Sequence, residues 1–266
     1  MSGAPSFVDF IRTRSERERN IVMKGLGARI NRSWRAHARP AQLPPEGDWR
    51  TWLIMAGRGF GKTRAGAEWV NQIAARGDSL RIALVGATAA EVRNVMVEGE
   101  SGILAACRCQ RPRWEPTRGL LSWPSGSRAF VYSGENPEGL RGPQHHAAWC
   151  DEIAKWAYPE GCWSNLQLGL RLGAAQRALV TTTPRPGALL RRLLADPATA
   201  VARGATQENP ALSPAFIARM VEAYGGTRLG RQELDGELIE DAEGALWPRA
   251  LIERCRVPPF TPPRRS

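Results

Sequence analysis

The stretch Trp52-Leu-Ile-Met-Ala-Gly-Arg-Gly-Phe-Gly-Lys-Thr-Arg-Ala-Gly66 joins an apolar segment to a glycine-rich turn and then to Lys62-Thr63. The apolar part predicts a buried strand, and the small residues that follow the turn predict a helix. Gly57, Gly59 and Gly61 let the backbone turn tightly and aim its N–H groups at an anion. The positive end of the helix adds to that attraction. This order of strand, loop and helix is typical of a nucleoside-triphosphate site.

Each residue of the loop has an expected role in holding ATP and its Mg²⁺. Lys62 is expected to reach the β- and γ-phosphates, and the Thr63 hydroxyl to ligate Mg²⁺. Ala56 stands where the G-x-x-x-x-G-K-[ST] pattern has its first glycine, and alanine is small enough to keep the turn. The alternative is an incidental Lys-Thr pair in an Arg/Gly-rich loop, which the strand and helix context disfavours. The residues expected to contact the nucleotide are Gly57, Arg58, Gly59, Phe60, Gly61, Lys62, Thr63 and Arg64.

The composition points to a basic protein without structural zinc or a disulfide framework. Its 266 residues suit one large α/β domain with appendages, or two small domains. The five cysteines form no C-x-x-C pair, so structural zinc and disulfides are not expected, and a reducing compartment is. No apolar run approaches membrane-spanning length. The formal net charge of +11 favours a polyanionic partner, although a solvated basic surface also accounts for it.

Three regions follow one another along the chain. Residues from about 6 to 38 are basic and carry apolar side chains at helical spacing, which predicts a helical arm. Residues 39–48 form a connection whose prolines cannot continue a helix. We therefore divide the chain into an arm and linker (1–48), a nucleotide-binding domain (49–240) and a proline-rich linker (241–266).

Strands and helices alternate across the central region. This alternation predicts an α/β fold of the P-loop NTPase class, with a mostly parallel sheet covered by helices on both faces. Ligands of such sheets lie at the carboxyl ends of the strands, where the loop places its phosphates. The expected strands are 52–56, 81–86, 128–132, 147–150, 178–182 and 200–205. The expected helices are 62–76, 89–98, 187–195 and 214–223.

A second chemical site follows the predicted strand over residues 147–150. Asp151 and Glu152 come directly after this strand, at the edge where a Mg-nucleotide would lie. Successive side chains point in different directions there, so the two carboxylates can take different roles. Asp151 is expected to orient the Mg²⁺ shell, largely through water, and Glu152 to deprotonate the attacking water. An Asp-Glu pair is also common at solvated strand ends, and only its combination with the phosphate loop favours catalysis.

Three hydroxyl residues, Thr181, Thr182 and Thr183, end another predicted strand before Pro184. Beside the γ-phosphate they would sense its presence and couple it to neighbouring elements. The opposing interpretation is that β-branched threonines merely favour the strand, and the residues alone do not decide between the two.

Together these signals resemble the ATPase half of the terminase large subunit, the DNA-packaging motor of tailed bacteriophages and phage-like gene transfer agents. The resemblance covers roughly residue 39 to the end, and the order of its motifs is more specific than any one of them. The matching segments are the phosphate loop 56–63, the segment 136–142 that precedes Walker B, Walker B itself at 149–152, the coupling motif 181–184 and the closing segment 230–237.

The resemblance implies an additional-strand (ASCE) P-loop ATPase that assembles as a ring, a pentamer, on the portal protein of an empty procapsid in the cytoplasm of the bacterial host. It would hydrolyse ATP to drive double-stranded DNA inward, with a small terminase subunit selecting the DNA. Family members usually carry a nuclease domain as well. The chain stops near where that domain would begin and lacks its acids, so we expect no nuclease activity, which a DNA cleavage assay with Mn²⁺ tests.

The resemblance also raises candidates outside the loop. An arginine finger supplies roughly 10³–10⁵-fold in rate, and Arg58 in cis and Arg141 in trans compete for that role. Arg141 is slightly favoured because a finger from the neighbouring subunit couples hydrolysis around a ring. The alternative is that Arg141 only forms a structural salt bridge. Gln42 occupies the place of the family's adenine-binding motif, although an exposed loop residue is an equal alternative.

Several alternatives stay open at the level of sequence. The basic arm either faces DNA, contacts a small terminase subunit or packs on the domain, and its apolar spacing favours packing. A helicase-like or remodelling ATPase shares the same motifs, but no second helicase core is present. A nucleotide-binding assembly protein without turnover is disfavoured by the intact Lys62, Thr63 and Glu152. A dinucleotide-binding enzyme needs a different glycine spacing.

Overall fold

The structure is a computed structural model, and it describes residues 18, 24, 33–76, 79–239 and 249–256. Eight strands form its centre: β1 Thr51–Ala56, β2 Arg81–Gly86, β3 Arg113–Glu115, β4 Leu120–Ser122, β5 Arg128–Ser133, β6 Ala147–Asp151, β7 Arg177–Thr182 and β8 Thr199–Gly204. They lie in one sheet in the order β3-β4-β5-β2-β6-β7-β1-β8. The β3–β4 and β4–β5 pairs are antiparallel and all others are parallel, which confirms the mostly parallel sheet that the sequence predicts.

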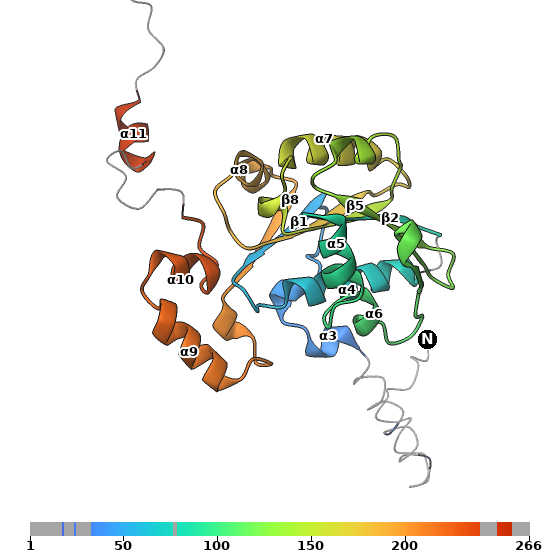
Figure 1. Ribbon diagram of the computed structural model, residues 1–266, viewed down its shortest axis with the longest axis horizontal. Helices are drawn as coiled ribbons and strands as arrows, with labels where there is room; N and C mark the ends of the chain where they lie inside the picture. Colours follow the sequence, from blue (N-terminus) through green and yellow to red (C-terminus); the bar gives the residue numbers. More distant parts are fainter. Residues whose placement is uncertain (1–17, 19–23, 25–32, 77–78, 240–248, 257–266) are drawn as a thin grey trace, which may run out of the picture.

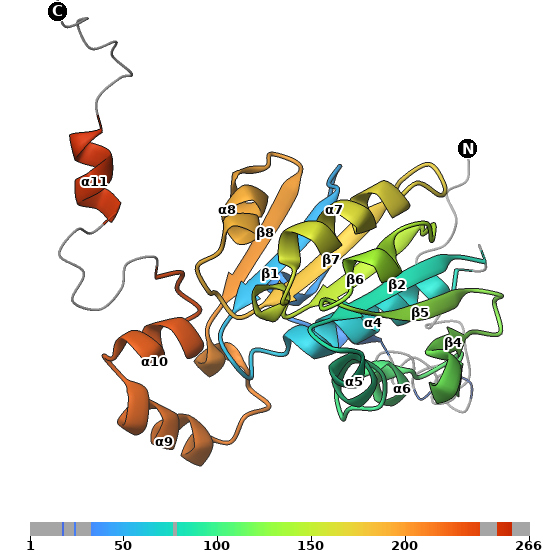
Figure 2. The same ribbon diagram turned by 45° about the horizontal axis from the view of Figure 1, so that its top comes forward.

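The sheet is covered on both faces (Figures 1 and 2). The helices are α3 Trp34–His37, α4 Lys62–Ala74, α5 Ala89–Glu91, α6 Ile103–Ala106, α7 Pro159–Gly169, α8 Ala188–Ala195, α9 Pro214–Tyr224, α10 Arg228–Glu233 and α11 Arg249–Cys255. Short helical turns are η1 Pro40–Gln42, η2 Val92–Val97, η3 Pro116–Arg118, η4 Pro137–Leu140, η5 Ile153–Lys155 and η6 Thr206–Glu208. None of the helices in these described ranges is long and apolar enough to cross a membrane.

The side chains of β1 point alternately to the two faces of the sheet, and each face has its own apolar core. All six residues of β1 are buried, because a parallel strand with helices on both faces has no solvated side. Trp52 and Ile54 join the core under α4, η2 and α6. Leu53 and Met55 join the second core, under α7 and α8. Burial on both faces is why the strand reads as a continuous apolar run in the sequence.

Strand register brings the functional ends together at one edge. Asp151, the last residue of β6, pairs with Thr181 of β7, and Met55 of β1 pairs with Thr182. The phosphate loop therefore leaves β1 at the level where the acidic pair and the threonines leave β6 and β7. The phosphate loop and the acidic pair are almost a hundred residues apart in the sequence. In the sheet only β7 lies between the strands β1 and β6 that carry them.

The predicted elements differ from the structure in several places. The helix expected over 89–98 is α5 followed by the π-helical turn η2. The sequence analysis missed α6, α7, α10 and the β3–β4 hairpin. Of the helix predicted for the arm, the structure describes α3 and the helical residues 18 and 24, and the rest lies outside the described residues, as does most of the linker 241–266. The domain boundaries after residues 48 and 240 stay predictions.

A buried histidine lies immediately before β6. His145 is 1% exposed, and its ring meets Tyr132 edge-on with the centroids 5.3 Å apart. Neither ring nitrogen has a hydrogen-bond partner within the described part of the chain. Burial, with a further contribution from the positive charge of Arg81 and from His146, lowers the pKa of His145 to about 4. This histidine is therefore neutral at physiological pH.

Candidate nucleotide site

The turn of the phosphate loop, residues 57–61, needs its glycines for two different reasons. Gly59 and Gly61 adopt positive φ of 75° and 95°, the left-handed region that glycine tolerates. At Gly57 the constraint is space, because a Cβ there would lie 2.3 Å from the Leu234 carbonyl oxygen. Ala56 still belongs to β1 and has no positive φ. An alanine at the first position of the motif is therefore compatible with the loop.

Lys62 begins α4 and turns its ammonium group back across the loop. Its Nζ donates to the carbonyl oxygens of Ala56 (2.9 Å) and Gly57 (3.1 Å) and to Thr183 Oγ1 (3.2 Å). The side chain is 7% exposed, and burial lowers the pKa of Lys62, against the opposing effect of the Glu152 and Asp151 carboxylates. All three N–H donors are engaged, so Lys62 has to exchange at least one partner to contact a phosphate.

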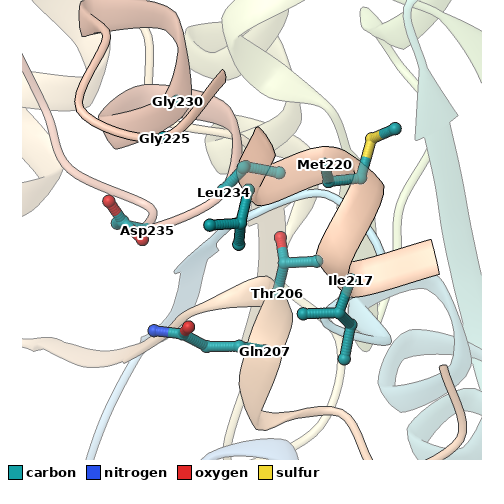
Figure 3. Close-up of a pocket in the computed structure, with 9 residues that line it drawn as sticks. Thr206, Gln207, Ile217, Met220, Gly225, Gly230, Leu234 and Asp235 are labelled. Carbon is teal, nitrogen blue, oxygen red and sulfur yellow. The ribbon is translucent and has the colours of Figure 1, made fainter. Parts of the chain in front are cut away.

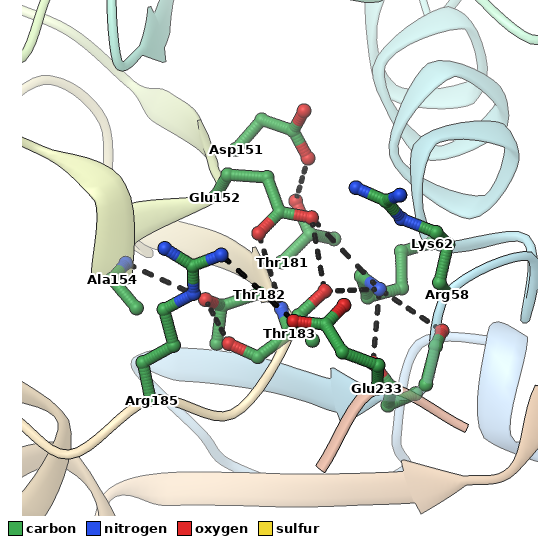
Figure 4. Close-up of polar contacts among 12 residues, drawn as sticks. Arg58, Lys62, Asp151, Glu152, Ala154, Thr181, Thr182, Thr183, Arg185 and Glu233 are labelled. Atoms are coloured by element: carbon green, nitrogen blue, oxygen red, sulfur yellow. Dashed lines mark hydrogen bonds and ion pairs between the residues drawn. The ribbon is translucent and has the colours of Figure 1, made fainter. Parts of the chain in front are cut away.

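Glu152 faces Lys62 across the Thr183 hydroxyl (Figure 4). Its Oε1 lies 3.9 Å from Lys62 Nζ. The backbone N–H of Thr183 donates to Oε2 (3.2 Å), and the hydroxyl of Thr183 donates to Oε1 (3.3 Å). Glu152 holds a left-handed backbone conformation, φ 47°, which is unfavourable for a side chain of this type. Such strain is a recurrent feature of functional sites.

Asp151 is held differently from its neighbour. It is 6% exposed, and its Oδ1 accepts a hydrogen bond from the Thr181 hydroxyl at 2.5 Å. Burial, together with the adjacent Glu152 carboxylate, raises the pKa of Asp151 to about 6. The two carboxylates thus occupy distinct environments: one is buried against Thr181, and the other faces the lysine.

The donor set at this edge fits Mg²⁺. No group of three or more His, Cys, Asp and Glu side chains that could hold a metal alone occurs among the described residues. Mg²⁺ is usually bound through one or two carboxylates together with substrate phosphates and water. Asp151, at the end of β6, and Thr63, in the first turn of α4, supply one carboxylate and one hydroxyl. Both are oxygen donors of the kind that this ion prefers.

Gln42 is bound to the phosphate loop and is not an exposed loop residue. It is 6% exposed, and its Nε2 donates to the carbonyl oxygens of Phe60 and Gly61, both at 3.3 Å. Its Oε1 accepts from the Arg39 backbone N–H at 3.1 Å. The Arg39 guanidinium donates to the Phe60 carbonyl oxygen and lies over the Phe60 ring. We call Arg39 and Gln42 the loop clamp.

The three candidate arginines take separate positions. Arg58 is exposed at the tip of the loop, beside Glu233 (Figure 4). Within α4, Arg64 donates from Nε (2.9 Å) and Nη2 (2.7 Å) to the same Glu68 oxygen, Oε1. Arg141 follows η4 and lies 3.5 Å from Glu138, in an ion pair whose partners are each 74% exposed. Exposed pairs of this kind contribute little to stability, so Arg141 remains available at the surface.

Residues that the sequence analysis missed hold the loop from the C-terminal side. Thr206 Oγ1 donates to the Arg58 carbonyl oxygen (2.6 Å), and Asn209 Nδ2 donates to that of Gly59 (2.6 Å). The Arg58 backbone N–H donates to the Glu233 carbonyl oxygen (2.6 Å). The contacts of Thr206 and Asn209 join residues some 150 positions apart, and in the sequence only the closing segment 230–237 indicated a role for this region.

A cavity of about 140 Å³ lies behind these contacts, between α9 and α10 (Figure 3). It is beside the phosphate loop and contains none of the predicted catalytic side chains. Thr206 and Leu234 line it, and both also contact the loop. The lining residues are Thr206, Gln207, Ile217, Met220, Val221, Gly225, Gly230, Leu234 and Asp235.

The sheet order and the glycine-rich loop after β1 together define a fold of the P-loop NTPase class, in which β7 lies between β1 and β6. Residues 53–254 match the family described as "Terminase large subunit, T4likevirus-type, N-terminal". The chain belongs to this family. No functionally curated protein matches the sequence.

Solved structures share the fold at low identity. The large terminase of a thermophilic bacteriophage, determined in complex with ADP, has a TM-score of 0.62 and 15% identity over 78% of this chain. The large terminase ATPase domain of Thermus phage P74-26 has a TM-score of 0.59 and 15% identity over 78% of this chain and 98% of its own. The chain spans about half of the ADP-bound terminase, 52% of its length.

Proposed function

We propose that this chain is the ATPase part of a terminase large subunit, which hydrolyses ATP to move double-stranded DNA into a procapsid. The contact of Lys62 and Glu152 through the Thr183 hydroxyl carries the proposal, because it joins the phosphate-binding, catalytic and coupling residues in one group. The family match and the fold shared with the two phage terminases support it.

In the proposed reaction, the backbone N–H groups of the phosphate loop and Lys62 bind the β- and γ-phosphates. Glu152 accepts a proton from the attacking water. The water oxygen bonds to the γ-phosphorus as the bond between the γ-phosphorus and the β–γ bridging oxygen breaks. Thr63 and Asp151 would hold Mg²⁺, which neutralises phosphate charge when bound. Thr183 contacts both Lys62 and Glu152, so a change at either is transmitted to the strand β7.

The test is ATP hydrolysis by the native chain and by Glu152→Gln, with and without double-stranded DNA. Loss of the general base is expected to lower kcat by at least about 100-fold, while the affinity for ATP is retained. Glu160→Gln, which alters an exposed ion pair with Arg192, is the matched control and should hydrolyse normally. Stimulation by DNA favours a motor. Equal rates for the Glu152 variant and the native chain would contradict the catalytic assignment.

Ring assembly is part of the same proposal, with a pentamer on the portal protein and a small terminase subunit as partners. The exposed position of Arg141 suits a finger that reaches the neighbouring subunit's ATP, whereas Arg58 would act in its own subunit. Rings mixed from Lys62→Ala and Arg141→Ala chains should recover part of the activity that each lacks alone. Mixed rings that stay inactive would favour Arg58.

A further inference from the structure

Trp149 is a buried residue that contacts two parts of the candidate nucleotide site, Thr181 and the helix α4. The residue is in β6, two positions before Asp151, and its side chain is fully buried. Its indole Nε1 donates a hydrogen bond to Thr181 Oγ1 at 2.9 Å. The same Thr181 oxygen is 2.5 Å from Asp151 Oδ1. The three side chains therefore form a chain of hydrogen bonds from the core to the carboxylate.

The chemistry of the donors fixes the direction of this chain. An indole nitrogen only donates, so Thr181 must accept from Trp149. The single hydroxyl proton of Thr181 is then free to point to one of two acceptors, Asp151 Oδ1 at 2.5 Å or the Cys150 carbonyl oxygen at 3.3 Å. The carboxylate is both closer and charged, which makes it the stronger acceptor. One oxygen of Asp151 is thereby held in a fixed orientation.

The ring of Trp149 also sets the position of α4. A Cβ at Gly66 would lie 2.1 Å from Trp149 Cε2 and 2.3 Å from Cζ2. The indole thus packs directly against the helix backbone, one turn after Thr63. A single side chain therefore contacts the helix that carries one proposed Mg²⁺ ligand and, through Thr181, orients the other.

We propose that Trp149 is a positioning residue for the Mg²⁺–nucleotide complex: its N–H directs the Thr181 hydroxyl to Asp151, and its ring sets the spacing of α4 from β6. The inference rests on the proposed nucleotide site and assigns Trp149 a function in metal affinity beyond packing. Partners that orient a metal ligand typically account for about 10–100-fold in metal affinity.

Trp149→Phe tests the N–H separately from the ring, because phenylalanine keeps an aromatic wedge against Gly66. Trp123→Phe is the matched control, since Trp123 is also buried in the same core and its indole donates to Asn71 Oδ1 at 3.2 Å, away from the site. ATPγS binding is measured by calorimetry with Mg²⁺ and with EDTA. The readout is the factor by which Mg²⁺ tightens binding.

Trp149→Phe should reduce this factor by about tenfold and leave the affinity in EDTA unchanged, and Trp123→Phe should alter neither. Thr181→Val should match Trp149→Phe, Thr181→Ser should retain native behaviour, and the double variant Trp149→Phe/Thr181→Val should add no further loss. An equal fall in both affinities for Trp149→Phe, or an additive double variant, would overturn the inference. Native chain that binds no ATPγS would overturn the proposed function with it.

Discussion

The buried His145 makes stability depend on pH in a way that one substitution should remove. Its pKa falls from an ordinary value near 6.5 to about 4 on folding, so the unfolded chain binds more protons than the folded chain between these values. Stability is therefore fully present above the unfolded pKa and is lost as pH falls toward the folded one. His145→Phe keeps a ring of similar size between Tyr132 and Phe130 and removes the proton site.

The magnitude follows from the size of the shift. A difference of about 2.5 pKa units corresponds to roughly 3 kcal/mol, which is reached once the pH is below both the unfolded and the folded pKa. Between about pH 7 and pH 5 the expected loss from this residue is about 2 kcal/mol. The side chain is 1% exposed, so solvent does not screen the effect.

Urea denaturation at several pH values measures the free energy of unfolding for both chains. The native chain should lose about 2 kcal/mol more than His145→Phe on acidification to about pH 5. At neutral pH the variant should be at least as stable, because it no longer buries two unpaired ring nitrogens. Parallel pH profiles for the two chains would refute the reasoning, and would mean that His145 reaches water or a partner.

Two further substitutions test the packing of the site and the loop clamp. Gly66→Ala should destabilise the fold by about 1–3 kcal/mol in thermal or urea unfolding, because its Cβ would meet the Trp149 ring at 2.1 Å; Gly187→Ala, where a Cβ meets nothing within 4 Å, is the control. Gln42→Ala should weaken ATP and GTP binding by a similar factor, about tenfold, because Gln42 contacts the loop; a loss confined to ATP would show that it reads adenine.

The sheet and its order of motifs were predictable because burial on both faces leaves apolar runs in the sequence. The strands β1, β2, β6 and β7 are such runs, and the alternating helices α4 and α8 are amphipathic. Helix α7 was missed since its sequence contains Gly161 and ends at Gly169, and its stability comes from Cys162, Trp163 and Leu166 in the second core. The β3 and β4 strands have three residues each, too few for periodicity to indicate a strand.

The candidate site divides in a similar way. Local motifs placed Lys62, Asp151 and Glu152, and the structure brings these three together with Thr181 and Thr183. The loop clamp and the contacts of Thr206 and Asn209 depend on tertiary packing, so no local pattern indicates them. The left-handed backbone conformation of Glu152 could not be predicted from the sequence either, because glutamate has no preference for this conformation.

The strand order has a consequence for biosynthesis. Strand β1, the first of the sheet to leave the ribosome, pairs only with β7 and β8, which are the last of its eight strands to be made. Until β7 has emerged, the segment that carries the phosphate loop has no neighbour in the sheet, while β2 to β6 can already pair with one another. Nucleotide binding should therefore not appear before β7 is made, and the nascent chain must protect an unpaired apolar strand while residues 57–176 are synthesised.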